Sequence, residues 1–260
     1  MKMSIVTPCY NSGMTIERTI KSVIEQKINF PLEYIIVDGL SSDDTMNIVK
    51  RYADQYPYIK YLSEKDNSMT EALNKGMKLT TGDIVASINA DDIYLPNALQ
   101  KVMDYFESNS ADVLMVNTYF VNAETNLIKS KNMPRIFSPL LTAFTECPFP
   151  ECGVFFRGDV IRKIGFFNEN IRYTQDFELY LRIKKSGYTF RYKNIDASCF
   201  FVSQFNYSST ICDQMNEEVY SYFKYSGIFK IFGQSTASKV LKILFRFRSY
   251  YVFKKKELDV

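Results

Sequence analysis

Apolar residues recur in two alternating rhythms along about the first third of the chain. Short apolar runs rich in β-branched residues predict buried strands, and four such runs end near residues 7, 38, 63 and 90. Between them, apolar residues three and four positions apart predict helices, the first over 16–24. Pro8 is expected to stop the first strand, and Asn11 and Ser12 to cap the first helix. This alternation predicts an α/β fold, in which a mostly parallel sheet carries helices on both faces.

The pattern is less regular after residue 95. Helices are predicted over 99–106, over 157–164 and from Asp176 onward, and strands over 113–121 and 153–156. Residues 130–150 contain four prolines and show little periodicity. We expect a nucleotide-binding half over 1–95 and a second half over 96–210.

Polar residues follow each of the four predicted strands of the first half. The carboxyl ends of parallel strands lie at one edge of a sheet, where open α/β folds bind their ligands. The residues expected at this edge are Thr7, Asp38, Glu64, Asp91 and Asp92. Neither a G-x-G-x-x-G nor a G-x-x-x-x-G-K-[ST] motif occurs, which argues against a dinucleotide site and a P-loop.

Two adjacent carboxylates, Asp91 and Asp92, close the fourth strand. Burial of a charge is costly unless the charge is paired or bound to a metal, and paired carboxylates suit Mg²⁺ or Mn²⁺ carrying phosphates. The alternative is a loop start or helix cap, for which Asp is also common.

Composition narrows the chemistry. The 260 residues include no histidine, which excludes Ser-His-Asp and Cys-His catalysis and leaves carboxylates as the leading acid–base groups. Five cysteines without a C-x-x-C pair, no signal peptide and no long apolar stretch predict a reduced, cytoplasmic protein. The net charge of +3 is too small to indicate nucleic-acid binding.

Four blocks, in order, carry a resemblance to a known family. They are Ile5–Asn11, Ile36–Thr45, the segment from Ser63 to Asp92, and Arg172–Leu179 with Arg182. On these blocks the chain resembles the family 2 glycosyltransferases, which implies a GT-A fold with a sheet mixed on the acceptor side. The resemblance implies an inverting transfer of a hexosyl or N-acetylhexosaminyl group from a nucleoside-diphosphate sugar, with UDP as the expected nucleotide.

The resemblance also implies a donor site. The residues that would bind the nucleotide-sugar are Thr7, Pro8, Tyr10, Asn11, Asp38, Ser41, Lys65, Lys75, Asn89 and Asp91. Asp92, supported by Asp91, would hold the divalent cation, and Asn89 stands where the family usually has Asp. Two alternatives remain open, since Asp38 also suits a turn with Gly39 and Lys75 a solvated surface.

Asp176 is the candidate general base of the resemblance, because the family places an Asp at a helix start to deprotonate the acceptor hydroxyl. The alternative is that Asp176 only caps the helix. Glu151, Gln175 and Arg182 are the candidate acceptor contacts. Glu151 and Cys152 stand where relatives often carry His-Gln, and Cys152 is expected to be a packed thiol.

The last fifty residues, 211–260, are predicted to form a helical, basic extension. Residues 239–256 hold seven Lys or Arg and no acidic residue, among many apolar and aromatic ones. Such a composition favours a helix over 236–256 that lies on the inner face of the plasma membrane. The alternative is a terminal helix packed on the domain.

The leading hypothesis is therefore a metal-dependent glycosyltransferase that acts on a glycan or lipid-linked acceptor in bacterial surface-polysaccharide synthesis, such as O-antigen or capsule. A sugar nucleotidyltransferase is disfavoured, because the loop 7–13 has one glycine and no basic residue. An inactive, membrane-associated scaffold is the third hypothesis, and the oligomeric state stays open.

Overall fold

The computed structural model describes residues 1–134 and 150–203. The predicted extension over 211–260, its segment 236–256 and the end of the predicted 96–210 half lie outside the described residues. Residues 1–134 and 150–202 belong to one compact unit.

The first half alternates strands and helices, as predicted. Its strands are β1 (Met3–Cys9), β2 (Leu32–Asp38), β3 (Ile59–Ser63) and β4 (Ile84–Ser87). Its helices are α1 (Ile16–Ile24), α2 (Thr45–Gln55) and α3 (Met69–Leu79). These four strands are parallel, in the order β3-β2-β1-β4.

The second half extends the same sheet with mixed directions. Its elements are β5 (Ile93–Tyr94), α4 (Ala98–Ser108), β6 (Val113–Asn122), β7 (Ile128–Asn132), the 3₁₀ turn η1 (Glu151–Gly153), β8 (Val154–Arg157), α6 (Gly158–Ile164), α7 (Gln175–Lys185) and β9 (Phe190–Val202). The sheet continues from β4 through β8, β6 and β9 to β5, and β7 pairs with β6. Strand β8 is antiparallel to both of its neighbours, so the predicted mixed region is confirmed.

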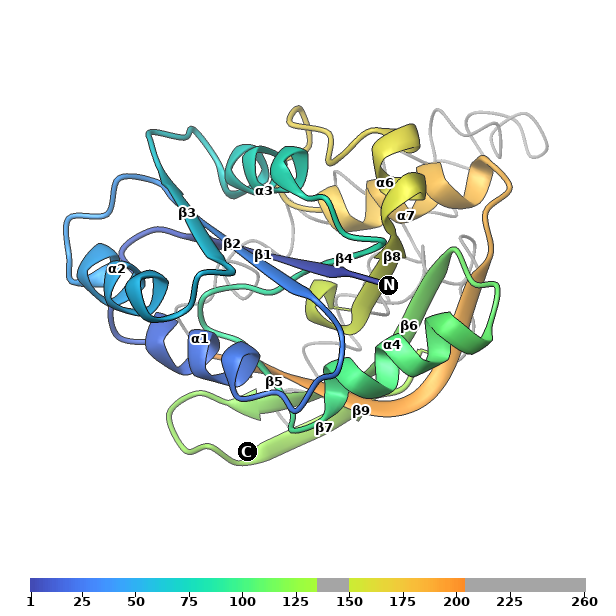
Figure 1. Ribbon diagram of the computed structural model, residues 1–260, viewed down its shortest axis with the longest axis horizontal. Helices are drawn as coiled ribbons and strands as arrows, with labels where there is room; N and C mark the ends of the chain where they lie inside the picture. The colour runs from blue at the N-terminus through green and yellow to red at the C-terminus, as the bar shows by residue number, and fades with distance from the viewer. Residues whose placement is uncertain (135–149, 204–260) are drawn as a thin grey trace, which may run out of the picture. The chain divides into compact units, whose positions relative to one another are not determined.

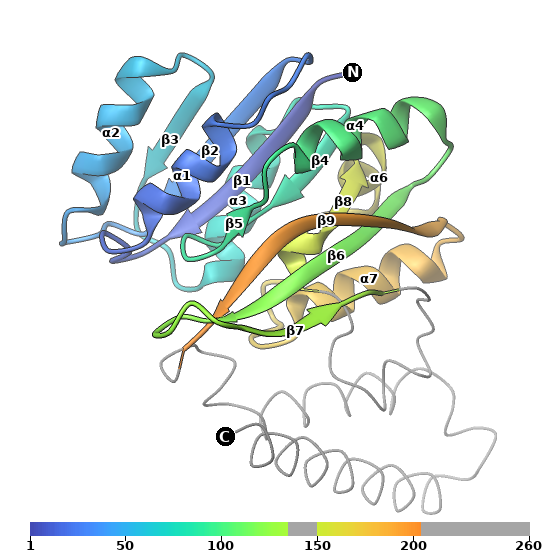
Figure 2. The same ribbon diagram turned by 90° about the horizontal axis from the view of Figure 1, so that it is seen from below.

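Helices cover both faces of the sheet, with α3, α6 and α7 on one side and α1 and α4 on the other (Figure 1). Figure 2 shows the long strand β9 running beside β6 across the second half. Helix α3 packs so closely on β1 that any side chain at Gly76 would collide with Val6. The core between these layers is apolar and includes Ile5, Ile36 and Phe155.

Two local predictions about the first strand and helix are wrong. Strand β1 continues through Pro8, which pairs with Val37 of β2. The carbonyl of Val6 faces β4 and accepts from the backbone N–H of Ile88. The nitrogen of Pro8 faces the same side, beyond the last paired residue of β4, so the N–H that proline lacks is not needed for strand pairing. Asn11 and Ser12 do not cap α1, whose N-cap is Thr15.

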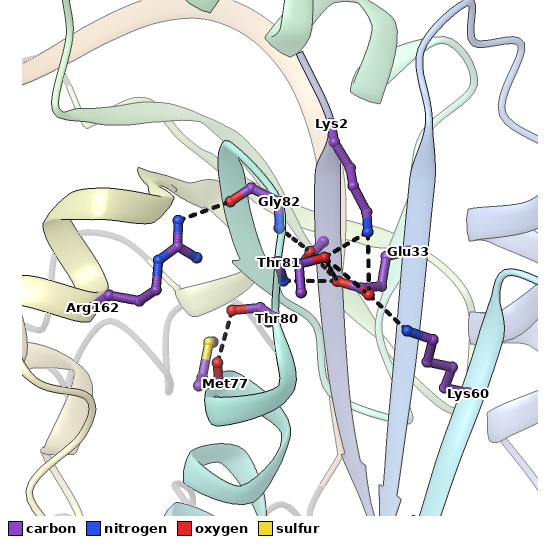
Figure 3. A network of polar contacts seen from close by, with 9 residues as sticks. Lys2, Glu33, Lys60, Met77, Thr80, Thr81, Gly82 and Arg162 are labelled. Carbon is purple, nitrogen blue, oxygen red and sulfur yellow. Dashed lines mark hydrogen bonds and ion pairs between the residues drawn. The ribbon is translucent and has the colours of Figure 1, made fainter.

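The amino edge of the sheet is closed by a buried carboxylate, Glu33 of β2, which is 2% exposed. Figure 3 shows the groups that converge on it: the ammonium groups of Lys2 and Lys60, at 3.3 and 3.0 Å, and the backbone N–H of Thr81, at 2.9 Å. Ser4 donates to the same carboxylate at 2.6 Å. The network therefore ties the turn before β4 to the starts of β1, β2 and β3.

Candidate active site

Asp38, at the carboxyl end of β2, organises the loops of the predicted donor site. Its carboxylate is fully buried and accepts from the backbone N–H and hydroxyl of Ser41 and from the hydroxyl of Ser63, at 2.6 Å for the last. These bonds fasten the loop after β2 to the end of β3. The structure therefore gives Asp38 a supporting role in this site.

The loop after β1 is fastened to the loop after β2. The backbone N–H of Asn11 donates to Ser41 Oγ at 2.8 Å, and Asn11 Oδ1 accepts from the backbone of Ser42 at 2.9 Å. Asn11 adopts a positive φ of 48°, a conformation that Asn tolerates better than most residues. Tyr10, beside it, is 64% exposed and leaves its ring accessible at this edge.

The side chains of Thr7 and Pro8 lie in the interior. Thr7 is fully buried, and its hydroxyl oxygen lies 3.1 Å from the hydroxyl oxygen of Tyr34. Pro8 is also buried. These two predicted nucleotide-sugar-binding residues therefore support the edge of the sheet from the interior, and their side chains do not face a ligand at that edge.

Asp66 lies beside Gly39 and Tyr10 at the predicted donor site, although it was not among the predicted site residues. A Cβ added at Gly39 would lie 2.7 Å from Asp66 Oδ2 and 3.3 Å from Cδ2 of the Tyr10 ring. Burial raises the pKa of Asp66, and the charges of Glu71 and Asp38 add to the rise while Lys75 opposes it. The available signal was its position just after β3, at the same edge as Asp38.

Lys75 is occupied within the protein. Its ammonium group lies 2.7 Å from the carbonyl of Lys65, 3.1 Å from Glu64 and 3.2 Å from Glu71. Burial lowers the pKa of Lys75, but the two carboxylates outweigh this effect and raise it overall. Lys75 therefore holds the loop after β3 against α3, and its contact with the nucleotide-sugar stays a prediction.

The turn after β4, residues 89–92, is held from two sides. Arg18 and Thr19 of α1 donate to the carbonyls of Asp91 and Asp92, at 2.8 and 2.7 Å. From β9, the backbone N–H of Phe201 donates to Oδ1 of Asp92 at 2.9 Å. The side chain of Asp92 consequently points into the protein and is 1% exposed.

The two carboxyls of this turn differ in accessibility. Burial raises the pKa of Asp92 well above its usual value, and the neighbouring charge of Asp91 adds to this effect. The pKa of Asp91 is also raised by burial, and Arg18 opposes that rise. Asp91 is only partly buried, so the structure favours Asp91 over Asp92 as the more reachable ligand, the reverse of the predicted ranking.

The residues of this turn fit a hard divalent cation. Two buried oxygens, Oδ2 of Asp92 and Oδ1 of Asn89, have no hydrogen-bond partner among the described residues. Together with the carboxylate of Asp91 they form an oxygen donor set of the kind that Mg²⁺ and Mn²⁺ prefer. The described residues include no group of three acidic, Cys or His side chains placed to hold a metal ion by themselves, so phosphates and water would complete the coordination.

Asp176 lies at the start of α7, where Oδ1 of its carboxyl accepts from the backbone N–H of Phe177 at 2.7 Å. Gln175, beside it, is 6% exposed, and its Oε1 has no hydrogen-bond partner among the described residues. Glu151 of η1 is buried and hydrogen-bonded to the hydroxyl of Ser87 in β4. Burial raises the pKa of Glu151 to about 7, and the charge of Asp176 adds to the rise.

Arg182 contacts groups of the protein itself, and its acceptor contact stays a prediction. Its guanidinium group donates to both carboxylate oxygens of Glu178, each at 3.0 Å. It also donates to the carbonyls of Ile164, Gly165 and Phe166, at 2.8, 2.8 and 2.6 Å. These bonds use all five N–H donors of an arginine, so Arg182 holds the loop between α6 and α7.

The fold and the edge residues define an α/β domain with a candidate ligand site at the carboxyl edge of its sheet. The family model described as "Glycosyl transferase family 2" matches residues 4–165. That match covers more than half of the chain, and the chain therefore belongs to glycosyl transferase family 2. Among the described residues, no helix is long and apolar enough to cross a membrane.

Three known proteins illustrate the relationship. The chain is 28% identical to the chondroitin synthase of Escherichia coli over 203 residues, which cover 76% of this chain and 28% of that protein. It is 24% identical over 223 residues to the minor teichoic acid biosynthesis protein GgaB of Bacillus subtilis (strain 168), covering 78% of this chain and 24% of GgaB. The structure of S. aureus TarS 1–349 in complex with UDP-GlcNAc is similar with a TM-score of 0.71 at 18% identity, over 86% of this chain and 66% of that one.

The structural likeness confirms the predicted GT-A fold. The chain spans about a quarter to a half of the length of the first curated relatives that it matches.

Proposed function

We propose that this domain transfers a sugar, with inversion, from a UDP-sugar to a hydroxyl group of a glycan or lipid-linked saccharide. The observation that carries the proposal is that the acidic residues of the site form two groups, one after the parallel strands and one around Glu151. Asp38, Asp66 and Asp91 follow three parallel strands, and the charge of Asp176 raises the pKa of Glu151, which is bonded to β4. The first group suits a donor and the second an acceptor.

The nucleotide would lie over the joined loops after β1, β2 and β3. Tyr10 offers an exposed aromatic face for a base, and Asp66 offers a carboxylate beside it for N–H or hydroxyl groups. The UDP-GlcNAc named with the TarS structure supports UDP as the nucleotide. Asn11 and Ser41 keep these loops in place.

Asp91, with Asn89 and the inward Asp92, would hold Mg²⁺ or Mn²⁺. The bound cation would offset the negative charge that develops on the departing nucleoside diphosphate. These residues contribute oxygen ligands from a turn that α1 and β9 keep rigid.

Asp176 would act as the general base. As the acceptor oxygen forms its bond to the anomeric carbon, the carboxylate of Asp176 takes the hydroxyl proton. The bond from the anomeric carbon to the phosphate oxygen breaks on the opposite face, and its electron pair leaves with the diphosphate. A single displacement of this kind inverts the anomeric configuration.

The acceptor belongs to the synthesis of a bacterial surface polysaccharide in this proposal, and the transferred group is a hexose or N-acetylhexosamine. The names of the chondroitin synthase and of GgaB support a polysaccharide product. The basic composition of residues 236–256 supports attachment to the inner face of the plasma membrane. Loss of sedimentation with anionic vesicles when the Lys and Arg of this segment become Gln would support that attachment, and unchanged sedimentation would oppose it.

Calorimetric binding and product-release assays distinguish the proposed transferase from the two alternative functions. A transferase is expected to bind UDP in the presence of Mn²⁺ and to release UDP from one member of a UDP-sugar panel. An inactive scaffold would bind neither UDP nor Mn²⁺. A nucleotidyltransferase would instead release pyrophosphate from UTP and a sugar 1-phosphate.

A further inference from the structure

Glu151 is a buried acid whose position links the two halves of the proposed site. It is the first residue of η1, just before β8, and β8 runs antiparallel to β4. The start of β8 therefore lies at the end of β4, the same end from which the turn 89–92 continues. The hydroxyl of Ser87, the last residue of β4, donates to Oε1 of Glu151.

The described residues pair Glu151 with no positive charge. The residue is 8% exposed, and no Lys or Arg in the described part of the chain forms an ion pair with it. The titratable groups whose fields act with it are Asp176 of α7, Asp92 after β4, Tyr94 of β5 and its neighbour Cys152. A charge on Glu151 would therefore be desolvated by burial and repelled by the negative charge of Asp176.

We propose that Glu151 is a positioning residue that retains a proton beside the general base, so that Asp176 alone carries the negative charge of this pair. The inference rests on the proposed function and deepens it, because it states how the base stays ionised in an acidic, buried site. In the transfer step the acceptor proton goes to Asp176, and Glu151 keeps its own proton throughout. Ser87 fixes the carboxyl of Glu151 from the strand that leads to the proposed cation site.

Electrostatics support this placement of the proton. Burial raises the pKa of Glu151 to about 7, with a further rise from Asp176, while the bond from Ser87 opposes the rise. The unfolded chain ionises this carboxyl near 4.5. Between these two values the folded state holds a proton that the unfolded state has lost, so Glu151 costs stability progressively as the pH rises.

The test compares the wild type with Glu151→Gln, which keeps the hydrogen bond and cannot ionise. The Tm of the variant minus the Tm of the wild type is expected to increase between about pH 5 and about pH 8, and this increase is the gain. Asp176→Asn should move the midpoint of this gain to lower pH, since it removes a neighbouring charge, and Ser87→Ala should move it to higher pH. A difference in Tm that is constant with pH, or a midpoint that neither substitution moves, would overturn the proposal.

Kinetics test the same proposal through the reaction. With the donor identified by the UDP-sugar panel, Glu151→Gln is expected to keep a higher kcat near pH 6 than Glu151→Ala, which loses about tenfold or more. The wild-type pH profile should show an ionisation near neutral pH that Glu151→Gln lacks, which a merely structural role would not produce. Identical pH profiles for the wild type and Glu151→Gln would contradict the proposal. The Tm series needs no turnover, so failure to find a donor counts against the proposed function alone.

Discussion

At the scale of single residues, the two neighbouring carboxyls after β4 have different environments. The sequence Asp91-Asp92 predicts a cation site but cannot tell which side chain faces outward, because that depends on β9, more than a hundred residues later. The structure buries Asp92 against the backbone of Phe201 and leaves Asp91 more accessible. The two residues should therefore respond differently to substitution.

Asp91→Asn is expected to weaken Mn²⁺ binding by about tenfold or more, measured calorimetrically with UDP present, while leaving the Tm nearly unchanged. Asp92→Ala should lower the free energy of unfolding by about 1–3 kcal/mol, because it removes the carboxyl oxygen that accepts from the buried N–H of Phe201. The opposite pattern, with Asp92→Ala folded normally but unable to bind Mn²⁺, would restore the ranking predicted from the sequence.

Arg182 shows the same limit of sequence reasoning. Its block matches the family, but the five bonds that fix its guanidinium group come from α7 itself and from the loop at 164–166. Arg182→Lys is expected to lower the free energy of unfolding by about 1–3 kcal/mol, since Lys has three donors on a single nitrogen. In the enzyme assay, its KM for the acceptor should stay near that of the wild type. A raised acceptor KM without loss of stability would return Arg182 to the acceptor site.

At the scale of elements, the regular part of the fold was predictable and the mixed part less so. Strands β1 to β4 are short apolar runs between amphipathic helices, and their local pattern is enough to identify them. Strand β9 escaped because its thirteen residues include charged ones and its register with β6 shifts near Asn117, which breaks the alternation that identifies a strand. Strand β5 has two residues, too few for any pattern.

The Glu33 network makes an element-scale prediction about acid stability. Burial alone would raise the pKa of Glu33, but the bonds from Ser4, Thr81, Lys60 and Lys2 outweigh it and lower the pKa from 4.5 to about 2. A lowered folded-state pKa stabilises the protein above pH 4.5, and this contribution, about 3 kcal/mol, disappears as the pH falls towards 2.

Glu33→Gln should therefore unfold more easily than the wild type at neutral pH, and the gap in urea-derived free energies should close between about pH 4.5 and pH 2. Lys60→Met serves as the matched control, since it removes one cation and retains the carboxylate, and it should show a smaller gap. Equal acid sensitivity of Glu33→Gln and the wild type would contradict the stabilising role assigned to this network.

At the scale of the whole described domain, the two edges of the sheet have different tasks. The amino edge is closed by the Glu33 network, whereas the carboxyl edge gathers Asp38, Asp66, Asp91 and Asp176. The sequence predicted this edge because parallel strands must end together, and it predicted Asp91 and Asp176 through motifs. It could not predict that Thr7, Lys75 and Arg182 contact other groups of the protein, since those contacts depend on side-chain geometry.

The most direct measurement of the central claim is the rate of UDP release from the UDP-sugar that the domain selects, with Mn²⁺ and acceptor present, for the wild type and Asp176→Asn. Asp176→Asn is expected to lose about a hundredfold or more in kcat while it still binds UDP and Mn²⁺ at wild-type affinity. Unchanged turnover in this variant would contradict the assignment of Asp176 as the general base.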